Sequence, residues 1–375
     1  MIPPALPIQV DFTPGQKKII NTIRKYDSIP RSRLTELTGL KSGSVTSITK
    51  ELLSMNFIKE GDKVKVARGQ PVKPLTLNEY AAFSMGVSFH VNTINVGITD
   101  FVGKMIDFFQ LNYNEKSAVN DVLSEIKHVI DELISKNKLS KARMLGMGVS
   151  IPGPVRQDGK VATVKELAQW RDISIADTFS QYFNLPVWVE NDCNAAAVGE
   201  YSSGKWKNIN NLIMIEIDHG IGGGIIINGQ IFSGSNSQSG EIGIYLSEMH
   251  GSNKVTLRQL VQQLNDNGLP ITHTSEIPDI AHPLVDAWLN KAADQLRPVI
   301  LLTRAWFDPD CIILGGAAPE FLSNALIERI GLNNRWKNLD FNDDCTQFFL
   351  APTRVGKHLN TYGACMLPVF KTLEL

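Results

Sequence analysis

Residues 187–197 read Val187-Trp188-Val189-Glu190-Asn191-Asp192-Cys193-Asn194-Ala195-Ala196-Ala197, which joins an apolar strand to a polar tripeptide and then to a small-residue helix. In an α/β protein, the end of such a strand is where a carboxylate and an amide face a ligand. Asp192 is then a candidate base for a sugar hydroxyl, and Asn191 is a candidate hydrogen-bonding partner for the same hydroxyl. Asn and Asp are also preferred helix N-caps, so a purely structural cap explains the stretch equally well.

Length and composition narrow the class of protein. The chain has 375 residues, enough for two or three domains with sizeable cores. It shows neither an apolar run long enough to cross a bilayer nor a basic leader followed by an apolar segment, so we expect a cytoplasmic protein without a membrane partner. The cysteines form no Cys-x-x-Cys pair, which argues against a disulfide framework and a structural zinc knot. They are Cys193, Cys311, Cys345 and Cys365.

The net charge of −1 conceals an uneven distribution. Residues 12–80 contain 13 Lys and Arg against 6 Asp and Glu, whereas the rest of the chain contains 24 against 32. Such a split indicates a polyanionic partner for the basic region, although many solvated helical faces are basic without binding anything.

The basic region has the pattern of three helices. Thr13-Pro14 is an N-cap followed by proline at the first helical position, and the isoleucines after it predict a first helix that ends near Tyr26. Ser32 is predicted to cap a short second helix, which Gly39 ends in a left-handed conformation. Ser42 is predicted to open a third helix.

The third predicted helix has a polar outer face. Val45, Ile48 and Leu52 have helical spacing and are expected to face inward. Small hydroxyl residues and one lysine remain outside, and such a set suits contacts in a DNA major groove. These candidate DNA contacts are Ser42, Ser44, Thr46, Ser47 and Lys50.

A hairpin is predicted after the third helix. Phe57–Glu60 and Lys63–Val66 read as two short strands joined at Gly61-Asp62, in the manner of a wing. Three helices and a wing form a winged helix-turn-helix. Arg68 follows in an extended Gly- and Pro-containing segment and is a candidate minor-groove contact, although a plain linker also explains it. Three such helices also occur as a packing unit that binds no DNA.

From residue 82 the pattern changes to alternating strands and helices. Phe83–Val87 and Thr93–Thr99 are predicted to pair, Met105–Leu111 to add a strand, and Ala118–Ser135 to form a helix. Met144–Ser150 is a further predicted strand, and a Pro-Gly-Pro turn follows it. This alternation is typical of α/β architecture.

A second half repeats the theme. Leu212–Ile217 and Ile225–Asn228 are predicted strands, and Gly220–Gly224 between them is predicted to form a flexible turn of a kind that cradles phosphate. A hairpin with close backbone packing explains the same glycines. Cys311–Leu314 is a predicted buried strand that runs into Gly315-Gly316, the position of a nucleotide base in such folds.

Five motifs, in this order, resemble the ROK family of repressors and sugar kinases. They are Gly148–Pro154, Glu190–Ala195, Gly220–Gly224, Gly240–Gly243 and Ile313–Gly316. The resemblance covers residues 80 to 370, and the region before it is similar to the repressor branch that includes the xylose and N-acetylglucosamine repressors. It implies an α/β protein in which an N-terminal winged helix-turn-helix precedes a two-lobed actin-like (ribonuclease H-like) sugar kinase fold.

The resemblance also implies domain boundaries. Residues 1–11 are expected to form a tail, and residues 12–80 the DNA-binding domain with its linker. Residues 81–195 with 360–375 are expected to form the first lobe, and residues 196–359 the second.

The same resemblance makes Asp192 the counterpart of the kinases' catalytic base. It assigns Gly153, Asn191 and Glu241 to the sugar pocket, whereas an exposed turn carboxylate is the other interpretation of Glu241. A carboxylate such as that of Asp192 also accepts a hydrogen bond from a sugar without any proton transfer. Retention of Asp192 therefore does not by itself indicate an enzyme.

The phosphate loops depart from the kinase pattern. Residues 88–92 read Ser-Phe-His-Val-Asn where the kinases resembled carry Asp-x-Gly-Gly-Thr, so a metal-coordinating carboxylate and two close-approach glycines are replaced and Mg-ATP is expected to fit poorly. Asp218-His219 precedes Gly220 where those kinases have glycine and threonine, which puts a carboxylate beside the phosphates. We therefore expect no catalytic residue and no cofactor, with Asp192 a vestigial base.

A zinc site is not expected either. Many family members follow Gly-Glu-Ile-Gly with a histidine and a cysteine cluster, but here Gly243 precedes Ile244-Tyr245 and no cysteine lies between Cys193 and Cys311. Because that histidine also reaches the sugar in the family, its loss leaves an unusual sugar, a phosphorylated sugar, or no small effector.

Together these features predict a transcriptional regulator, a repressor of carbohydrate uptake or catabolism genes. It is expected to bind operator DNA as a homodimer or higher homo-oligomer and to respond to a sugar or sugar-phosphate effector between the lobes. Two alternatives stay open. One is an ATP-dependent sugar kinase with a DNA-binding head, and the other is a regulator controlled by a phosphotransferase-system protein.

Overall fold

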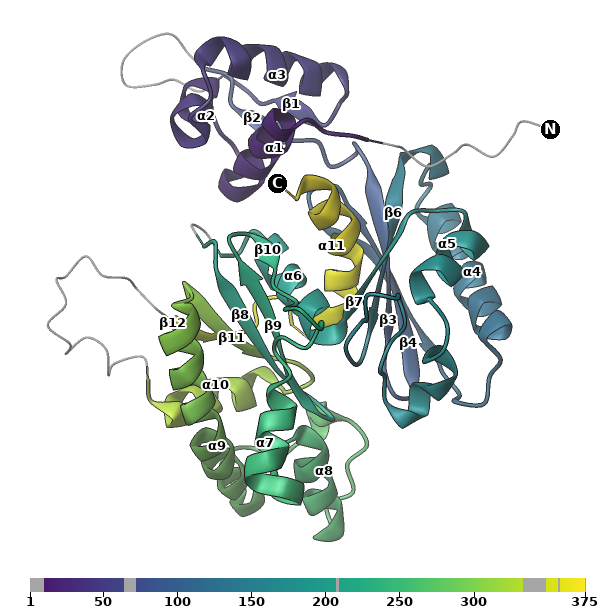
Figure 1. The fold of residues 1–375 in the computed structure, drawn as a ribbon, viewed down its shortest axis with the longest axis vertical. Helices are drawn as coiled ribbons and strands as arrows, with labels where there is room; N and C mark the ends of the chain where they lie inside the picture. Colours follow the sequence, from purple (N-terminus) through teal and green to yellow (C-terminus); the bar gives the residue numbers. More distant parts are fainter. Residues whose placement is uncertain (1–9, 64–71, 207–208, 333–348, 357, 375) are drawn as a thin grey trace, which may run out of the picture. The chain divides into compact units, whose positions relative to one another are not determined.

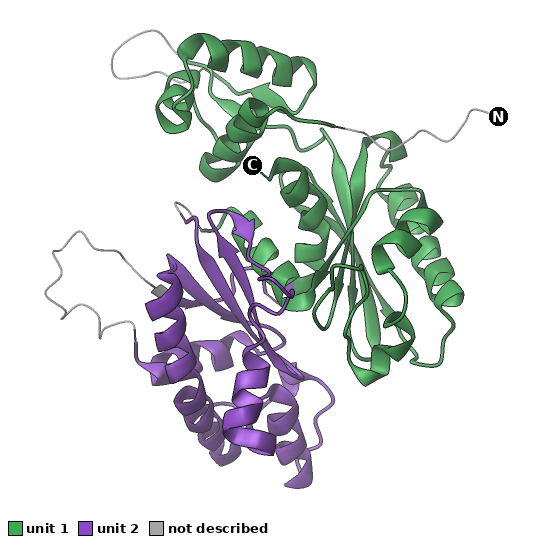
Figure 2. Ribbon diagram, in the orientation of Figure 1, with its two compact units in different colours: residues 1–208, 360–375 green, residues 209–359 purple. Residues whose placement is uncertain are grey.

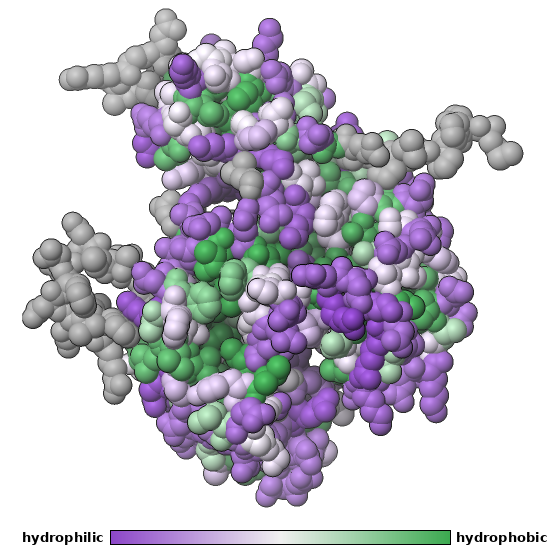
Figure 3. All heavy atoms as spheres, viewed as in Figure 1, coloured by the Kyte–Doolittle hydropathy of each residue, from purple (hydrophilic) through white to green (hydrophobic). Residues whose placement is uncertain are grey.

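The computed structural model describes residues 10–63, 72–206, 209–332, 349–356 and 358–374. The chain divides into two compact units, which are residues 1–208 with 360–375 (unit 1) and residues 209–359 (unit 2) (Figure 2). Within the described residues, no helix is long and apolar enough to cross a membrane. The face of the protein seen in Figure 3 is mostly hydrophilic, with apolar residues interspersed.

The N-terminal module of unit 1 (residues 10–63 and 72–80) contains three helices and a two-stranded antiparallel sheet (Figure 1). These elements are α1 (Pro14–Tyr26), α2 (Arg31–Thr38), α3 (Ser42–Ser54), β1 (Ile58–Glu60) and β2 (Leu75–Leu77). As predicted, α1 starts at Thr13: its hydroxyl accepts a hydrogen bond from the backbone N of Gln16 at 3.3 Å, and the Gln16 side chain accepts one from the backbone N of Thr13 at 3.0 Å. Gly39 ends α2 with φ of +66°, also as predicted.

The start of α2 and the partner strand of β1 differ from the prediction. Ser32 is not a cap, because α2 begins one residue earlier and the carbonyl of Pro30 accepts hydrogen bonds from the backbone N of Arg33 and of Leu34 at 3.0 and 3.1 Å. The described partner of β1 is β2, with Ile58 opposite Leu77. Most of the predicted partner strand, residues 64–66, and Arg68 lie outside the described residues.

The rest of unit 1 is built on a five-stranded sheet in the order β5-β4-β3-β6-β7. Its strands are β3 (Phe83–Phe89), β4 (Thr93–Asp100), β5 (Met105–Asn112), β6 (Met144–Ile151) and β7 (Val187–Asn191). β4 is antiparallel to β3 and to β5, whereas β6 is parallel to both β3 and β7. The predicted succession of strands along this part of the chain is confirmed.

The two faces of this sheet have different side chains because residues alternate along each strand. On one face, large apolar residues pack against α4 (Val119–Lys136) and α5 (Ile175–Phe183). On the other face lie glycines, and α11 (Leu359–Leu373) rests on their backbone (Figure 1). A Cβ added at Gly86 would lie 2.3 Å from the backbone N of Cys365, and one at Gly148 would lie 2.0 Å from the carbonyl oxygen of Ala364. Only glycine permits so close an approach.

A further helix, α6 (Asp192–Ser202), packs on α11. A Cβ added at Gly363 of α11 would lie 1.8 Å from the carbonyl oxygen of Ala195 in α6. The two helix backbones therefore touch, so that neither helix can shift far without the other.

Unit 2 repeats the topology of the first sheet in the order β10-β9-β8-β11-β12. Its strands are β8 (Leu212–Ile217), β9 (Ile221–Ile227), β10 (Gln230–Ile231), β11 (Cys311–Gly315) and β12 (Phe349–Pro352). β9 is antiparallel to β8 and β10, and β11 is parallel to β8 and β12. The helices are α7 (Ile242–His250), α8 (Leu257–Asp266), α9 (Pro283–Phe307) and α10 (Glu320–Ile330), and they share an apolar core with the sheet.

The prediction of a flexible glycine-rich turn at Gly220–Gly224 is wrong. β9 begins at Ile221, and Gly222–Gly224 pair with residues 214–216 of β8. Their alternative interpretation, close backbone packing, is correct: a Cβ at Gly240 would lie 2.0 Å from the carbonyl oxygen of Gly223, and one at Gly243 would lie 2.4 Å from that of Ile221. The Gly-Glu-Ile-Gly motif is therefore pressed against β9.

Short 3₁₀ helices complete the described elements. They are η1 (Lys141–Arg143), η2 (Lys165–Trp170), η3 (Gly251–Asn253) and η4 (Thr274–Glu276). Cys193, Cys311 and Cys365 are buried and form no disulfide among the described residues, whereas Cys345 lies outside them.

Candidate functional site

Three parallel strands of unit 1 end at one edge of the sheet and bring sequence-predicted residues together there. Ser88 of β3 is in register with Ser150 of β6, and Ile151 of β6 pairs with Asn191 of β7. The turn containing Gly153 follows Ile151 directly and so lies beside Asn191 and Asp192. The carboxyl edge of parallel strands is the usual position of a ligand in such sheets.

Gly153 has a backbone conformation that favours glycine. Its φ is +99°, and a Cβ added there would lie 2.2 Å from the carbonyl oxygen of Ala162. The structure thus gives Gly153 a packing role, which holds the turn at the edge of the sheet whether or not a ligand is bound.

Asn191 is the N-cap of α6. Its side-chain oxygen accepts a hydrogen bond from the backbone N of Asn194 at 3.1 Å. The structural cap that the sequence left open is therefore confirmed. Because the oxygen serves the helix, the amide NH₂ of Asn191 is the group that a ligand hydroxyl would engage.

Asp192 is the first residue of α6 and is half-buried. Its Oδ1 accepts a hydrogen bond from the backbone N of Cys193 at 3.0 Å. The amino end of a helix carries partial positive charge, which stabilises a carboxylate at this position. Asp192 is thus held as a hydrogen-bond acceptor at the edge of the sheet.

Glu190 is a half-buried carboxylate that sequence reasoning did not single out. Its carboxylate lies 3.7 Å from Nζ of Lys371 and accepts a hydrogen bond from Nδ2 of Asn194 at 3.2 Å. Burial raises the pKa of Glu190, and the attraction of Lys371 opposes that shift only in part. An acidic residue in an otherwise apolar strand was the available signal, but nothing in the sequence pointed to its partner on α11.

Ser88 and His90 lie at and just beyond the end of β3, in the stretch predicted to correspond to the kinases' first phosphate loop. The Ser88 side chain is completely buried, and its Oγ lies 3.1 Å from Nε2 of His90 and 2.7 Å from Oγ1 of Thr361 on α11. The hydroxyl is therefore engaged within the protein. It ties β3 to α11 at the edge where a kinase would hold a metal-bound phosphate.

Unit 2 carries the remaining predicted site residue. Glu241 stands at the N-cap position of α7 and is half-buried, and this burial raises its pKa. In the turn between β8 and β9, Nδ1 of His219 lies 3.0 Å from Oδ1 of Asp218. The imidazole therefore faces the carboxylate of Asp218 in the turn predicted to correspond to the kinases' second phosphate loop.

The predicted DNA-contacting residues of α3 share one exposed surface. Ser42, Ser44, Thr46, Ser47 and Lys50 are all exposed. The opposite side of α3 is in the core, as Val45 and Leu52 are buried there, while Ile48 is half-buried against Gly15 of α1.

Sequence reasoning missed one member of the buried side of α3. Thr49 is completely buried, and its hydroxyl oxygen accepts a hydrogen bond from Nε of Arg31 at 3.2 Å. A lone threonine between apolar positions carries little signal, because its hydroxyl suits either surface or core.

Comparison with known proteins identifies relatives named as repressors and relatives named as sugar kinases. A family model described as "ROK family" matches residues 91–330. The xylose repressor of Bacillus subtilis (strain 168) is 31% identical over 239 residues, which are 63% of this chain and 61% of the repressor. The match thus spans less than two thirds of that repressor's length.

Two solved structures show the same fold. One is a ROK family transcriptional regulator described as a homologue of the E. coli MLC protein, with a TM-score of 0.61, 21% identity, and coverage of 96% of this chain and 97% of that one. The other is a ROK family glucokinase from Streptomyces griseus in complex with glucose and AMPPNP, with a TM-score of 0.60, 22% identity, and coverage of 76% and 99%. The predicted α/β sugar kinase fold is thereby confirmed.

Proposed function

This chain belongs to the ROK family, and from that membership we propose that it is a DNA-binding transcriptional repressor of carbohydrate uptake or catabolism genes, controlled by a sugar or sugar phosphate. The observation that carries the proposal is the exposed row of hydroxyls and one lysine along α3, on a basic module attached to a sugar kinase fold. The similarity to a xylose repressor supports the same function.

In this proposal the N-terminal module is a winged helix-turn-helix and α3 is its recognition helix. Ser42, Ser44, Thr46 and Ser47 face base edges, because small hydroxyl side chains both donate and accept hydrogen bonds. Lys50 contacts a backbone phosphate. Arg68 remains a candidate minor-groove contact.

The sugar site in this proposal follows the family resemblance. In unit 1, the Asn191 amide donates to a sugar hydroxyl, Asp192 accepts from one, and the Gly153 turn shapes the wall beside them. In unit 2, Glu241 has a raised pKa, so near neutral pH it retains more of the protonated form that donates a hydrogen bond. Binding and operator release are then linked by a difference in effector affinity between two conformations.

Phosphoryl transfer is not part of this proposal. A kinase needs a metal-bound phosphate at the end of β3, and there the Ser88 hydroxyl is engaged by Thr361 and His90. In the second loop, Asp218 adds negative charge where phosphates would bind, with His219 against it. Asp192 then serves as an acceptor for the sugar rather than as a base.

The remaining elements of the proposal concern location and partners. We place the protein in the cytoplasm as a homodimer or higher homo-oligomer, because winged helices commonly read two half-sites with two copies. A phosphotransferase-system protein is the alternative controlling partner.

Thermal unfolding of the purified chain tests the proposal. The panel contains D-xylose, D-glucose, N-acetyl-D-glucosamine and glucose 6-phosphate, each with and without Mg-ATP. Ligands that bind the native state raise its apparent stability by mass action. A shift with one sugar class and none with Mg-ATP is expected. A clear Mg-ATP shift would support the kinase alternative, and no shift with any compound would favour control by a protein partner.

A further inference from the structure

α11 contacts both the candidate sugar edge and the N-terminal module. Its first turns touch the edge of the sheet, where Thr361 bonds to Ser88 at 2.7 Å and Gly363 meets Ala195 of α6 in backbone contact. Its last turn reaches α1. α11, which contains Pro368, thus runs between the two sites within unit 1 (Figure 1).

A bridging residue connects the sugar edge to the ion pair on α11. The backbone N of Asn194 donates to the side chain of Asn191 at 3.1 Å, and Nδ2 of Asn194 donates to Glu190 at 3.2 Å. Glu190 in turn lies 3.7 Å from Lys371. A ligand that turns the Asn191 amide therefore acts on the residue that also holds the Glu190 carboxylate.

Side chains from the N-terminal module donate hydrogen bonds to the last carbonyls of the segment that ends α11. The last carbonyls of a helix have no partner within the helix. Here the Leu373 carbonyl accepts a hydrogen bond from Nδ2 of Asn21 at 2.9 Å, and the Glu374 carbonyl accepts one from Nζ of Lys17 at 2.8 Å. The charge of Lys17 also suits the negative end of the helix dipole.

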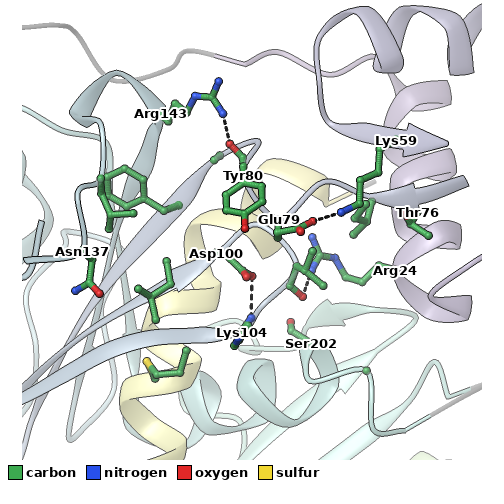
Figure 4. Close-up of a pocket in the computed structure, with 18 of the residues that line it drawn as sticks. Arg24, Lys59, Thr76, Glu79, Tyr80, Asp100, Lys104, Asn137, Arg143 and Ser202 are labelled. Atoms are coloured by element: carbon green, nitrogen blue, oxygen red, sulfur yellow. Dashed lines mark hydrogen bonds and ion pairs between the residues drawn. The ribbon is translucent and has the colours of Figure 1, made fainter. Parts of the chain in front are cut away.

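A second contact holds the module beside a cavity. Arg24 of α1, which is labelled at the cavity in Figure 4, donates to the carbonyls of Phe101 and Val102 in the β4–β5 turn at 2.7 and 3.0 Å. Its Nε is buried and has no hydrogen-bond partner among the described residues. A cavity of about 1010 Å³ borders this contact, and Lys59 and Asn137 are among its other lining residues. Arg24 therefore fixes the module to the β4–β5 turn at a point separate from the end of α11.

We propose that α11 transmits the state of the sugar edge to the DNA-binding module. Glu190 and Lys371 act as positioning residues that join the sugar edge to the last turn of α11, and Asn21 and Lys17 hold the carbonyls of Leu373 and Glu374 directly after Lys371. A ligand at Asn191 or Asp192 shifts the start of α6, and α11 moves with α6 because their backbones touch. Helix shifts of about 1–2 Å are a common form of such a switch. This inference rests on the proposed function.

The test compares operator affinity with and without sugar. The operator is a DNA fragment selected by the wild-type chain from a random pool, and the sugars are D-xylose, D-glucose, N-acetyl-D-glucosamine and glucose 6-phosphate. The test variant combines Lys17→Met with Asn21→Leu. The control is Lys18→Met, because Lys18 is an exposed lysine on the same helix, so its removal changes the charge of α1 equally.

The expected result is a loss of coupling without a loss of binding. Coupling between two sites usually changes affinity about 5- to 150-fold. In Lys17→Met/Asn21→Leu we expect the ratio of operator dissociation constants with and without sugar to fall at least about fivefold toward one, whereas Lys18→Met keeps the wild-type ratio. The sugar affinity of the DNA-free protein should not change. Since coupling is reciprocal, DNA should also cease to alter sugar affinity in the double variant.

Lys371→Met provides a second arm, because Lys371 lies 3.7 Å from Glu190 and 3.8 Å from Glu374 and makes no contact with DNA in the proposed function. It should reduce the same ratio while leaving sugar-free operator affinity within about twofold of wild type. An unchanged ratio in both variants, or an equal loss in Lys18→Met, would overturn the inference and leave the proposed function standing. A wild-type chain whose operator binding ignores every sugar would overturn both.

Discussion

The contact between α6 and α11 makes a sharp prediction for Gly363→Ala. The new Cβ would lie 1.8 Å from the carbonyl oxygen and 2.4 Å from the carbonyl carbon of Ala195. Ordinary contacts between such atoms begin near 3.4 Å, so the two helices must part by roughly 1.5 Å or the backbone must distort. Neither obstructing atom belongs to a flexible side chain.

The magnitude follows from two opposing effects. Overpacking a tight interior contact costs about 1–3 kcal/mol. Replacing glycine by alanine inside a helix contributes about 1 kcal/mol in favour of the variant. Because the obstruction here is backbone on both helices, we place the overpacking cost at the upper end, and we expect Gly363→Ala to lose about 1–2 kcal/mol of stability.

Urea unfolding followed by tryptophan fluorescence measures this change. Gly43→Ala is the matched control, since Gly43 lies in α3 and a Cβ added there meets nothing within 4 Å. The same substitution should stabilise the protein there by up to about 1 kcal/mol. We expect the free energy of unfolding to fall in Gly363→Ala and to rise in Gly43→Ala. A Gly363→Ala variant as stable as the wild type would refute the direct backbone contact between α6 and α11.

Three further predictions concern single side chains. Asn191→Ser should keep the cap of α6 and lose sugar binding, whereas Asn191→Ala should lose both sugar binding and about 1 kcal/mol of stability. Calorimetric titration measures the sugar binding of each variant, and urea unfolding measures its stability. Equal stability of the two variants would count against the cap. Lys50→Ala should lower the slope of log operator affinity against log salt by about one, and an unchanged slope would remove Lys50 from the phosphate contacts. Because the folded-state pKa of Glu190 is raised, its carboxyl group favours the folded state at low pH, and this contribution is lost as the pH rises through the folded pKa. Unfolding free energies at about pH 4 and pH 7 should therefore show wild type losing stability relative to Glu190→Gln as pH rises, and a difference that moves the other way would contradict the raised pKa.

Local signals predicted most elements of the fold. The Thr13-Pro14 cap and Gly39 mark helix ends because they satisfy backbone groups within a few residues. Alternation along β3 predicted a strand for the same local reason. The polar end of β7 also gave the candidate sugar residues, and the structure adds that Asn191 serves as a cap at the same time.

What the sequence left out depends on contacts between distant segments. Gly222–Gly224 were predicted to form a turn because glycine allows many backbone conformations. In the structure they pair with β8, and Gly240 packs against the backbone of Gly223. The local sequence does not indicate that distant contact. The Glu190–Lys371 ion pair joins the edge strand β7 to the last helix, which lie far apart in the sequence. Ser32 failed as a cap because Pro30, two positions earlier, is already extended and its carbonyl accepts the first hydrogen bonds of α2.

The discontinuous make-up of unit 1 affects the order in which the protein assembles during synthesis. Residues 1–208 leave the ribosome first, but α11 belongs to the same unit and follows all of residues 209–359. Until it arrives, the glycine-lined face of β3 and β6 has no cover, and the nascent chain must keep a long loop open before its last contacts form. The N-terminal module then lacks the carbonyls that Asn21 and Lys17 hold in the finished protein. Its final position is thus set only after residues 360–374 have been made, which keeps a shorter nascent chain from taking up the same arrangement.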